Sequence, residues 1–326
     1  MSTELPPETH EEGESGPLFS LVSGEGDGFM LGLAAGDTAG GAWKLGYSAI
    51  TEQATVISYH LIGLRELKTE KLTESLLELN GVQGNEAVYR GESPQFKAWL
   101  DRSGKTSADP DVESLVRCCP VGAAFRRDAD AVVRVALSVS EVFTTDAASM
   151  ISGALGAAAV AAAAFGQSGR DLLAGVSEAV IGAAAELGDG VSGLERLDSL
   201  ERELHDSVEH VGLTTGQAAE AAVGGLGGDP LRMAIAGLLL AAPMADTPHR
   251  AVEEAARIGG SVLGGFVGAV VGARVGIRAW PWPFANDTWF AEIGRRVVRG
   301  PDEIRDLPIP YAVEQHLMSG APQGLH

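Results

Sequence analysis

Glycine recurs at every fourth residue in two segments of this sequence, and this spacing constrains the fold more than any other feature. The first series begins at Gly28 and ends at Gly40, and the second runs from Gly260 to Gly276. Residues four apart share one face of an α-helix, although each glycine costs about 1 kcal/mol of helix propensity relative to alanine. We therefore expect two helices whose backbones approach closely at the centre of the fold, with Asp37 at one end of the contact.

The composition favours many closely packed helices. Apolar residues make up 45% of the chain, whereas aromatic residues are only 6%. No segment has the alternation typical of a β-strand. We predict an all-α protein with a single compact, many-helix domain over residues 26–310, a disordered acidic tail over residues 1–25 and a C-terminal tail over residues 311–326.

Apolar residues at helical spacing predict the individual helices. The expected ranges are 28–38, 51–67, 71–79, 111–127, 129–143, 145–165, 171–187, 192–210, 215–223, 230–242, 247–276 (as one helix or two) and 286–298. Thr51 is expected to cap its helix, and Pro120 is expected to interrupt residues 111–127. Residues 81–110 are polar and are expected to be irregular.

The formal charge of −20 argues against nucleic acid and against anionic membranes as partners. The longest apolar run, residues 258–273, is 16 residues long, which is shorter than the ~20 residues that a bilayer requires. The N-terminus lacks an apolar signal sequence. The adjacent thiols of Cys118 and Cys119 fit a reducing compartment, and we expect these residues to be buried packing residues and not a redox pair. We expect a cytoplasmic protein.

Four stretches, in order, resemble the ADP-ribosylglycohydrolase family, which includes the dinitrogenase reductase-activating glycohydrolase. They cover roughly residues 27 to 300 and are GFMLGLAAGDTAG (28–40), TEQATV (51–56), VESLVRCCPVG (112–122), and AARIGGSVLG (255–264). The segment from Thr144-Thr145 to Phe165 corresponds to the alanine-rich helix that follows the third stretch in the family. The resemblance implies the family's all-α fold.

The resemblance also implies which residues correspond to the ligands of the family's two Mg²⁺-type ions. By register these positions are Thr51, Glu52, Gln53, Ser261, Leu263 and Gly264. Three of the four aspartates of the family pattern have lost their charge, and hard divalent ions require anionic oxygen ligands. We therefore expect a degenerate metal site without the two Mg²⁺ ions and no other cofactor.

The family's Gly-Asn-Gly loop, which lets the backbone approach a phosphate, corresponds to positions near Val112 and Glu113. At the place where the resemblance implies a diphosphate, this chain therefore has the side chains of Val112 and Glu113 and the negative charge of Glu113.

Two acids are candidates for catalysis at the former site. Asp37 is either a pocket acid or a buried acid bonded to a helix N-terminus, and Glu52 is either a residual general base or a first-turn glutamate favoured by the helix dipole. The substrate pocket that the resemblance implies would also include five positions: Thr51, Gln53, Arg117, Thr145 and Ser261. Arg117 has the alternative interpretation of a cap or an ion-pair partner.

Other features have structural interpretations that we favour over functional ones. His60 is expected to be a packing residue, residues 201–210 a solvated acidic face, and residues 224–230 a turn between helices. Trp280, Trp282 and Phe284 are expected to close the core rather than to form a partner-binding patch.

Our favoured hypothesis is that the chain keeps the ADP-ribosylglycohydrolase fold, has lost two-metal hydrolysis and acts as a binding, scaffolding or regulatory module. It would bind a protein partner, a second copy of itself or a nucleotide-like small molecule. The first alternative is a metal-independent hydrolase of ADP-ribosyl or related nucleotide substrates that uses Asp37 and Glu52. The second is a divergent hydrolase with metal ligands from residues 201–209.

Overall fold

The computed structural model describes residues 26–41, 46–63, 67–81, 89, 91–187, 228–243, 247–277, 280 and 286–300. All regular elements in these ranges are α-helices: α1 (Phe29–Gly40), α2 (Ala49–Gly63), α3 (Thr69–Gly81), α4 (Pro94–Asp101), α5 (Ser114–Arg117), α6 (Cys119–Ala124), α7 (Ala129–Glu141), α8 (Ala147–Ala164), α9 (Gly169–Leu187), α12 (Pro230–Ala241), α13 (Pro248–Val275) and α14 (Asp287–Arg299). One isolated β-bridge joins Ser107 to Thr144. The predicted all-α class is confirmed.

Helices α1 and α13 pack against each other through the two glycine series. Their glycines face each other in four pairs: Gly28 with Gly272, Gly32 with Gly268, Gly36 with Gly264, and Gly40 with Gly260. A Cβ atom on any of these α1 glycines would overlap the backbone of its partner. The carbonyl oxygen of Gly268 lies where a Cβ of Gly32 would be. This oxygen therefore faces a Cα hydrogen of Gly32, which is the geometry of a weak Cα–H···O bond. The predicted close contact is confirmed.

Helix α13 is two helices joined at a kink. Gly259 and Gly260 have non-helical dihedral angles, and the φ of Gly260 is +61°, a conformation that glycine adopts without a Cβ clash. A new helical segment therefore starts at Ser261, directly beside the end of α1. The alternative of two helices for residues 247–276 describes the chain better than that of one.

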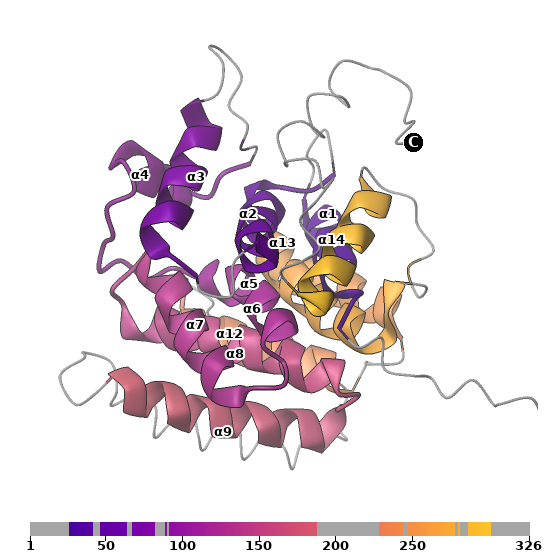
Figure 1. The fold of residues 1–326 in the computed structure, drawn as a ribbon. Coiled ribbons are helices and arrows are strands. Elements are labelled where there is room, and N and C mark those ends of the chain that lie inside the picture. The colour runs from indigo at the N-terminus through magenta and orange to yellow at the C-terminus, as the bar shows by residue number, and fades with distance from the viewer. Residues whose placement is uncertain are drawn as a thin grey trace, which may run out of the picture.

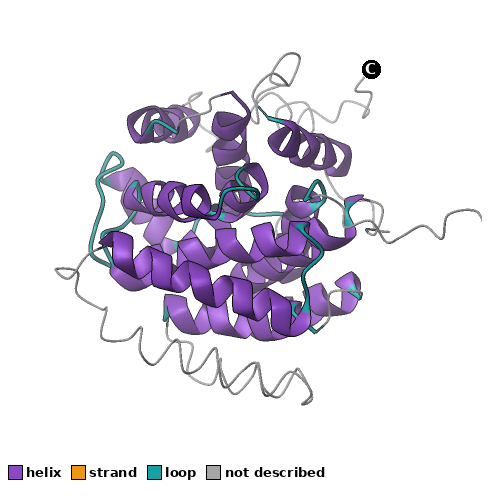
Figure 2. Cartoon of the chain, turned by 60° about the horizontal axis from the view of Figure 1, so that its bottom comes forward, coloured by secondary structure: helices purple, strands orange, loops and turns teal. Residues whose placement is uncertain are grey.

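The remaining helices surround α8 and the α1–α13 pair. Helix α8 is buried on nearly every residue and contacts α5, α6, α7, α9, α12 and α13. Figure 1 shows α9 along one edge of the fold next to α8, with α3 and α4 on the opposite side, and Figure 2 shows the long helices stacked on one another. Helix α14 packs on α1, α2 and α6. The alanine-rich helix predicted over residues 145–165 therefore lies at the centre of the described part of the fold.

Two local predictions are wrong. Thr51 does not cap α2, because the helix begins two residues earlier at Ala49. Residues 81–110 are not irregular throughout, because they contain α4, whose first amide groups are capped by Ser93: its hydroxyl accepts a hydrogen bond from the Phe96 amide at 3.1 Å. A Ser-Pro pair at a helix start is a recognised signal, but the polar composition of the segment obscured it. The predicted helices over 192–210 and 215–223 lie outside the described residues.

Among the described residues, two helices are long and apolar enough to cross a membrane by length and composition, α8 and α13. The apolar 18-residue window of α8 is 89% buried inside the fold, and that of α13 is 61% buried. Such burial is what the core helices of a packed domain show, so their length and composition give weak evidence for membrane spans.

Replacing Gly36 by alanine should destabilise the protein strongly. The new methyl group would overlap the Gly264 carbonyl, and separating two helix backbones that already touch should cost at least about 2 kcal/mol of unfolding free energy. Urea denaturation monitored by circular dichroism measures this loss.

Gly182→Ala is the matched control, since Gly182 also lies within a helix. A Cβ there would meet only the Val133 side chain at 3.9 Å, so the improved helix propensity should stabilise the fold by up to about 1 kcal/mol. Equal effects of the two substitutions would contradict the role of the glycine contact.

Candidate functional site

Asp37 lies at the C-terminal end of α1 and holds the start of α2. Its side chain is fully buried. The Oδ2 atom accepts three hydrogen bonds, from the Ser48 amide at 2.7 Å, the Ser48 hydroxyl at 3.0 Å and the Thr51 hydroxyl at 2.7 Å. Because Ser48 directly precedes α2, the carboxylate binds the first turn of that helix. The geometry matches the interpretation of Asp37 as a buried acid at a helix N-terminus.

The other carboxylate oxygen of Asp37 accepts none of these hydrogen bonds. Oδ1 is buried and has no hydrogen-bond partner among the described residues. Burial raises the pKa of Asp37, although hydrogen bonds from Ser48, Thr51 and Ser261 oppose this shift. The Ser261 hydroxyl donates to the main-chain oxygen of Asp37 at 3.2 Å. The structure therefore brings together Asp37, Thr51 and Ser261, three of the predicted site residues.

Glu52 follows Thr51 in the first turn of α2 and is 4% exposed. A carboxylate in a first turn interacts favourably with the helix dipole. A general base must also reach its substrate, and burial restricts that access. Both interpretations of Glu52 therefore remain predictions.

Gln53 and Arg117 belong to a second cluster, which is an internal ion network. The guanidinium of Arg117 donates from Nη1 to Asp111 and from Nη2 to Glu113 at 2.6 Å, and its Nε donates to Gln53 Oε1 at 2.5 Å. The amide of Gln53 donates in turn to Glu113 at 3.4 Å. Four polar side chains from α2 and the α5 region thus bond to one another inside the fold.

Aromatic rings complete the surroundings of Arg117. Its guanidinium carbon lies 4.0 Å from the ring centroid of Phe143 and 5.9 Å from that of Phe96, distances typical of cation–π contacts. Arg117 is 1% exposed. The ion-pair interpretation of Arg117 is therefore the one that its contacts match. Asp111 and the two rings were not identified from the sequence, because nothing in the spacing of residues links them to Arg117.

Thr145 lies apart from the buried clusters, in the exposed turn before α8. Its amide and hydroxyl both donate to the Ser107 carbonyl, at 2.8 and 3.4 Å. Its role in a substrate pocket stays a prediction.

Leu263 and Gly264, the last two positions of the predicted metal-ligand set, have no side-chain atom that can coordinate a metal ion. Leu263 is fully buried, and Gly264 packs on the backbone of Gly36. Gln53 offers its carbonyl oxygen to Arg117, so this oxygen is not directed to a cation. Magnesium prefers carboxylate and water ligands in an octahedral arrangement. The side chains at these positions do not fit a pair of Mg²⁺ ions.

The match to a protein-family model decides the relationship that the motifs suggest. The ADP-ribosylglycohydrolase model matches residues 27–308, which is most of the chain. This chain belongs to the ADP-ribosylglycohydrolase family. Comparison with curated proteins gives no match. Within the ranges that the structure describes, no group of three or more His, Cys, Asp and Glu side chains is placed to hold a metal ion.

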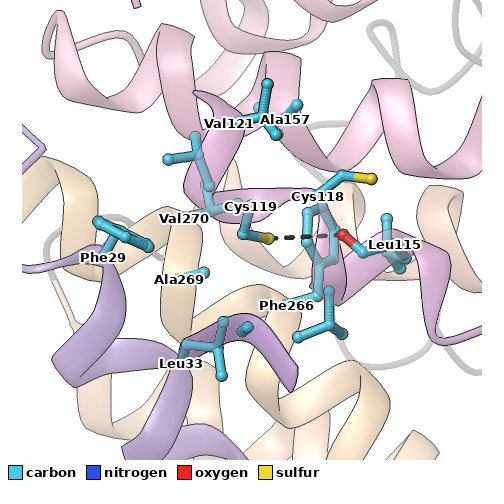
Figure 3. Packing of buried hydrophobic residues seen from close by; sticks show 14 of the residues in the cluster. Phe29, Leu33, Leu115, Cys118, Cys119, Val121, Ala157, Phe266, Ala269 and Val270 are labelled. Carbon is cyan, nitrogen blue, oxygen red and sulfur yellow. Dashed lines mark hydrogen bonds between the residues drawn. The ribbon is translucent and has the colours of Figure 1, made fainter. Parts of the chain in front are cut away.

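The two cysteines of this ADP-ribosylglycohydrolase homologue are packing residues. Both are fully buried, and burial raises the pKa of Cys118 to about 12 and that of Cys119 well above its usual value. Cys119 lies among apolar side chains and its Sγ contacts the Leu115 carbonyl at 3.5 Å (Figure 3). Thiolate chemistry is disfavoured in such surroundings.

The structure also places two further candidates. His60 is hydrogen-bonded to Ser75 at 2.9 Å, and burial lowers its pKa, which suits its predicted structural role between α2 and α3. Trp280 is 9% exposed, as expected for a residue that closes the core. Trp282, Phe284, the acidic residues 201–210 and most of the glycine-rich turn at 224–230 lie outside the described residues.

Arg117→Met should destabilise the protein much more than Glu113→Gln. The first substitution leaves two buried acids without their cation, which costs about 3–5 kcal/mol. The second keeps an acceptor for Arg117 and leaves the Asp111–Arg117 pair neutral, so we expect a loss below about 2 kcal/mol. Urea titrations of both variants measure the difference, and equal losses would show that the network is not organised around the arginine.

Proposed function

We propose that this chain is an ADP-ribosylglycohydrolase-fold protein that has lost two-metal hydrolysis and acts as a binding, scaffolding or regulatory module. The main support for the proposal is that the side chains at the positions of the family's metal ligands make contacts inside the protein. Gln53 bonds to Arg117, the Ser261 hydroxyl bonds to the backbone of α1, and Leu263 is part of the core. These positions contribute to folding contacts.

The state of Arg117 supports the same proposal. Its positive charge faces Asp111 and Glu113, so it is already neutralised by the protein's own carboxylates. Glu113 lies where the resemblance implies a diphosphate-binding loop, and its carboxylate is 1% exposed. An anionic ligand at this place would therefore find Arg117 already paired and one carboxylate more than there are cations. This buried negative charge disfavours the binding of an anion.

The proposal leaves the fold available for binding through other surfaces. A protein partner, a second copy of the chain or a nucleotide-like molecule each remains a candidate, and a cytoplasmic location remains part of the proposal. The alternative is a metal-independent hydrolase in which Asp37 and Glu52 serve as acid and base. The Oδ1 atom of Asp37, which has no hydrogen-bond partner among the described residues, supports this alternative.

Hydrolysis assays test the proposal directly. The full chain is incubated with ADP-ribosyl-arginine and with an ADP-ribosyl-serine peptide, in Mg²⁺ or in EDTA, and released ADP-ribose is quantified by chromatography. We expect release at the rate of the protein-free control in both buffers, because the residues at the ligand positions do not fit a metal pair. Release that Mg²⁺ stimulates and EDTA abolishes would contradict the proposal.

A variant pair distinguishes the alternative. Activity that persists in EDTA, is lost in Glu52→Gln and is retained in Glu141→Gln would establish metal-independent hydrolysis. Glu141 is an exposed acid at the end of α7, so its substitution controls for the change of charge alone.

A further inference from the structure

A cavity of about 400 Å³ lies between α7, α8 and α9. This volume is within the range of pockets for small organic ligands, about 300–1,000 Å³. None of the residues that line it belongs to the two clusters around Asp37 and Arg117. Figure 1 shows the three helices side by side at the edge of the fold where α9 lies. The cavity is therefore a feature of its own.

The hollow exists because small residues face each other across it. Helix α9 contributes Gly175, Ala179 and Gly182, which are four and three residues apart and so share one face. Helix α8 contributes alanines, among them Ala158 and Ala161. A Cβ atom on Gly182 would still be 3.9 Å from its nearest neighbour. These facing positions on α8 and α9 are thus apolar, and the space between them is not filled by side chains of these helices.

The charged residues that line the cavity are mostly acidic. Asp130 belongs to the first turn of α7, and Glu178 and Glu186 lie on the same helix, α9. The single cationic side chain of the lining is Arg126, whose Nη1 donates to the carbonyls of Ala123 and Val298 at 3.2 and 3.1 Å. Three carboxylates against one guanidinium give the lining a net negative charge, which attracts a cation.

An aromatic side chain also suits a cationic ligand. Phe165 lines the cavity and is 57% exposed, one of two large apolar side chains with such exposure in the described part of the chain. An exposed aromatic ring beside carboxylates is a typical binding partner for an ammonium group. Gln167 also lines the cavity, and its buried Oε1 accepts no hydrogen bond from any described residue. This oxygen has almost no exposed surface and lies against the backbone of α9 near Gly175, so it does not face the open space of the cavity.

We propose that this cavity binds a small organic cation, an ammonium group carried on an apolar chain or ring. The apolar body would fill the space between α8 and α9. The ammonium group would be held by the carboxylates and the Phe165 ring. This proposal is independent of the function proposed above, because it uses none of the same residues.

Calorimetric titration of the full chain with three probes of equal length tests the proposal. The probes are n-octylammonium, n-octanol and n-octanoate, all kept below their aggregation limits. We expect n-octylammonium to bind at least about tenfold more tightly than n-octanol, since a charge-assisted contact adds to the same apolar contact, and n-octanoate to show no binding. Equal binding of all three probes, or tighter binding of n-octanoate, would overturn the proposal.

Variants locate the binding to the cavity. Glu178→Gln should weaken n-octylammonium binding about three- to tenfold and leave n-octanol binding unchanged, whereas Glu141→Gln, which removes an exposed acid outside the cavity, should change neither. Ala179→Leu should abolish binding of both probes by filling the space, and thermal denaturation verifies that this variant is folded. Unchanged n-octylammonium binding in folded Ala179→Leu would also overturn the proposal.

Discussion

The contact between the backbones of α1 and α13 is the interaction on which the rest of this structure depends. Side chains normally separate packed helices by 8–10 Å between axes. Here glycine faces glycine at four successive turns, and a single methyl group would overlap a carbonyl oxygen of the other helix. The low helix propensity of these glycines is offset by dispersion contacts and Cα–H···O geometry along the whole length of α1.

This contact fixes the surroundings of the candidate site. It holds the end of α1 against the kink of α13, where Gly260 adopts a positive φ and Ser261 starts a new helical segment. Asp37, at the end of α1, then binds the first turn of α2 through Ser48 and Thr51. Helix α2 is therefore positioned by hydrogen bonds to α1. The family's fold is retained, although only one of the four acidic positions of the two-metal pattern, Glu52, still has a carboxylate.

The sequence predicts the frame better than the site. The glycine spacing predicts the α1–α13 contact because close approach has one dominant steric requirement, and the order of the four stretches predicts the family that the matched model shows. The start of α2 was misplaced because its cap comes from Asp37, eleven residues before Ser48. The partners of Arg117 were missed for a related reason: Gln53 and Phe143 meet it only after folding. The cavity beside α9 results from small residues on separate helices, which no local pattern predicts.

The central claim is that the residues at the family's ligand positions now make internal contacts and do not hold a metal pair. Titration of the full chain with Mn²⁺, followed by electron paramagnetic resonance of the free ion, tests it most directly. The account predicts only weak binding, with no saturable site tighter than about 1 mM. Saturable uptake of two Mn²⁺ ions per chain at micromolar concentration, lost in Glu52→Gln and retained in Glu141→Gln, would contradict it.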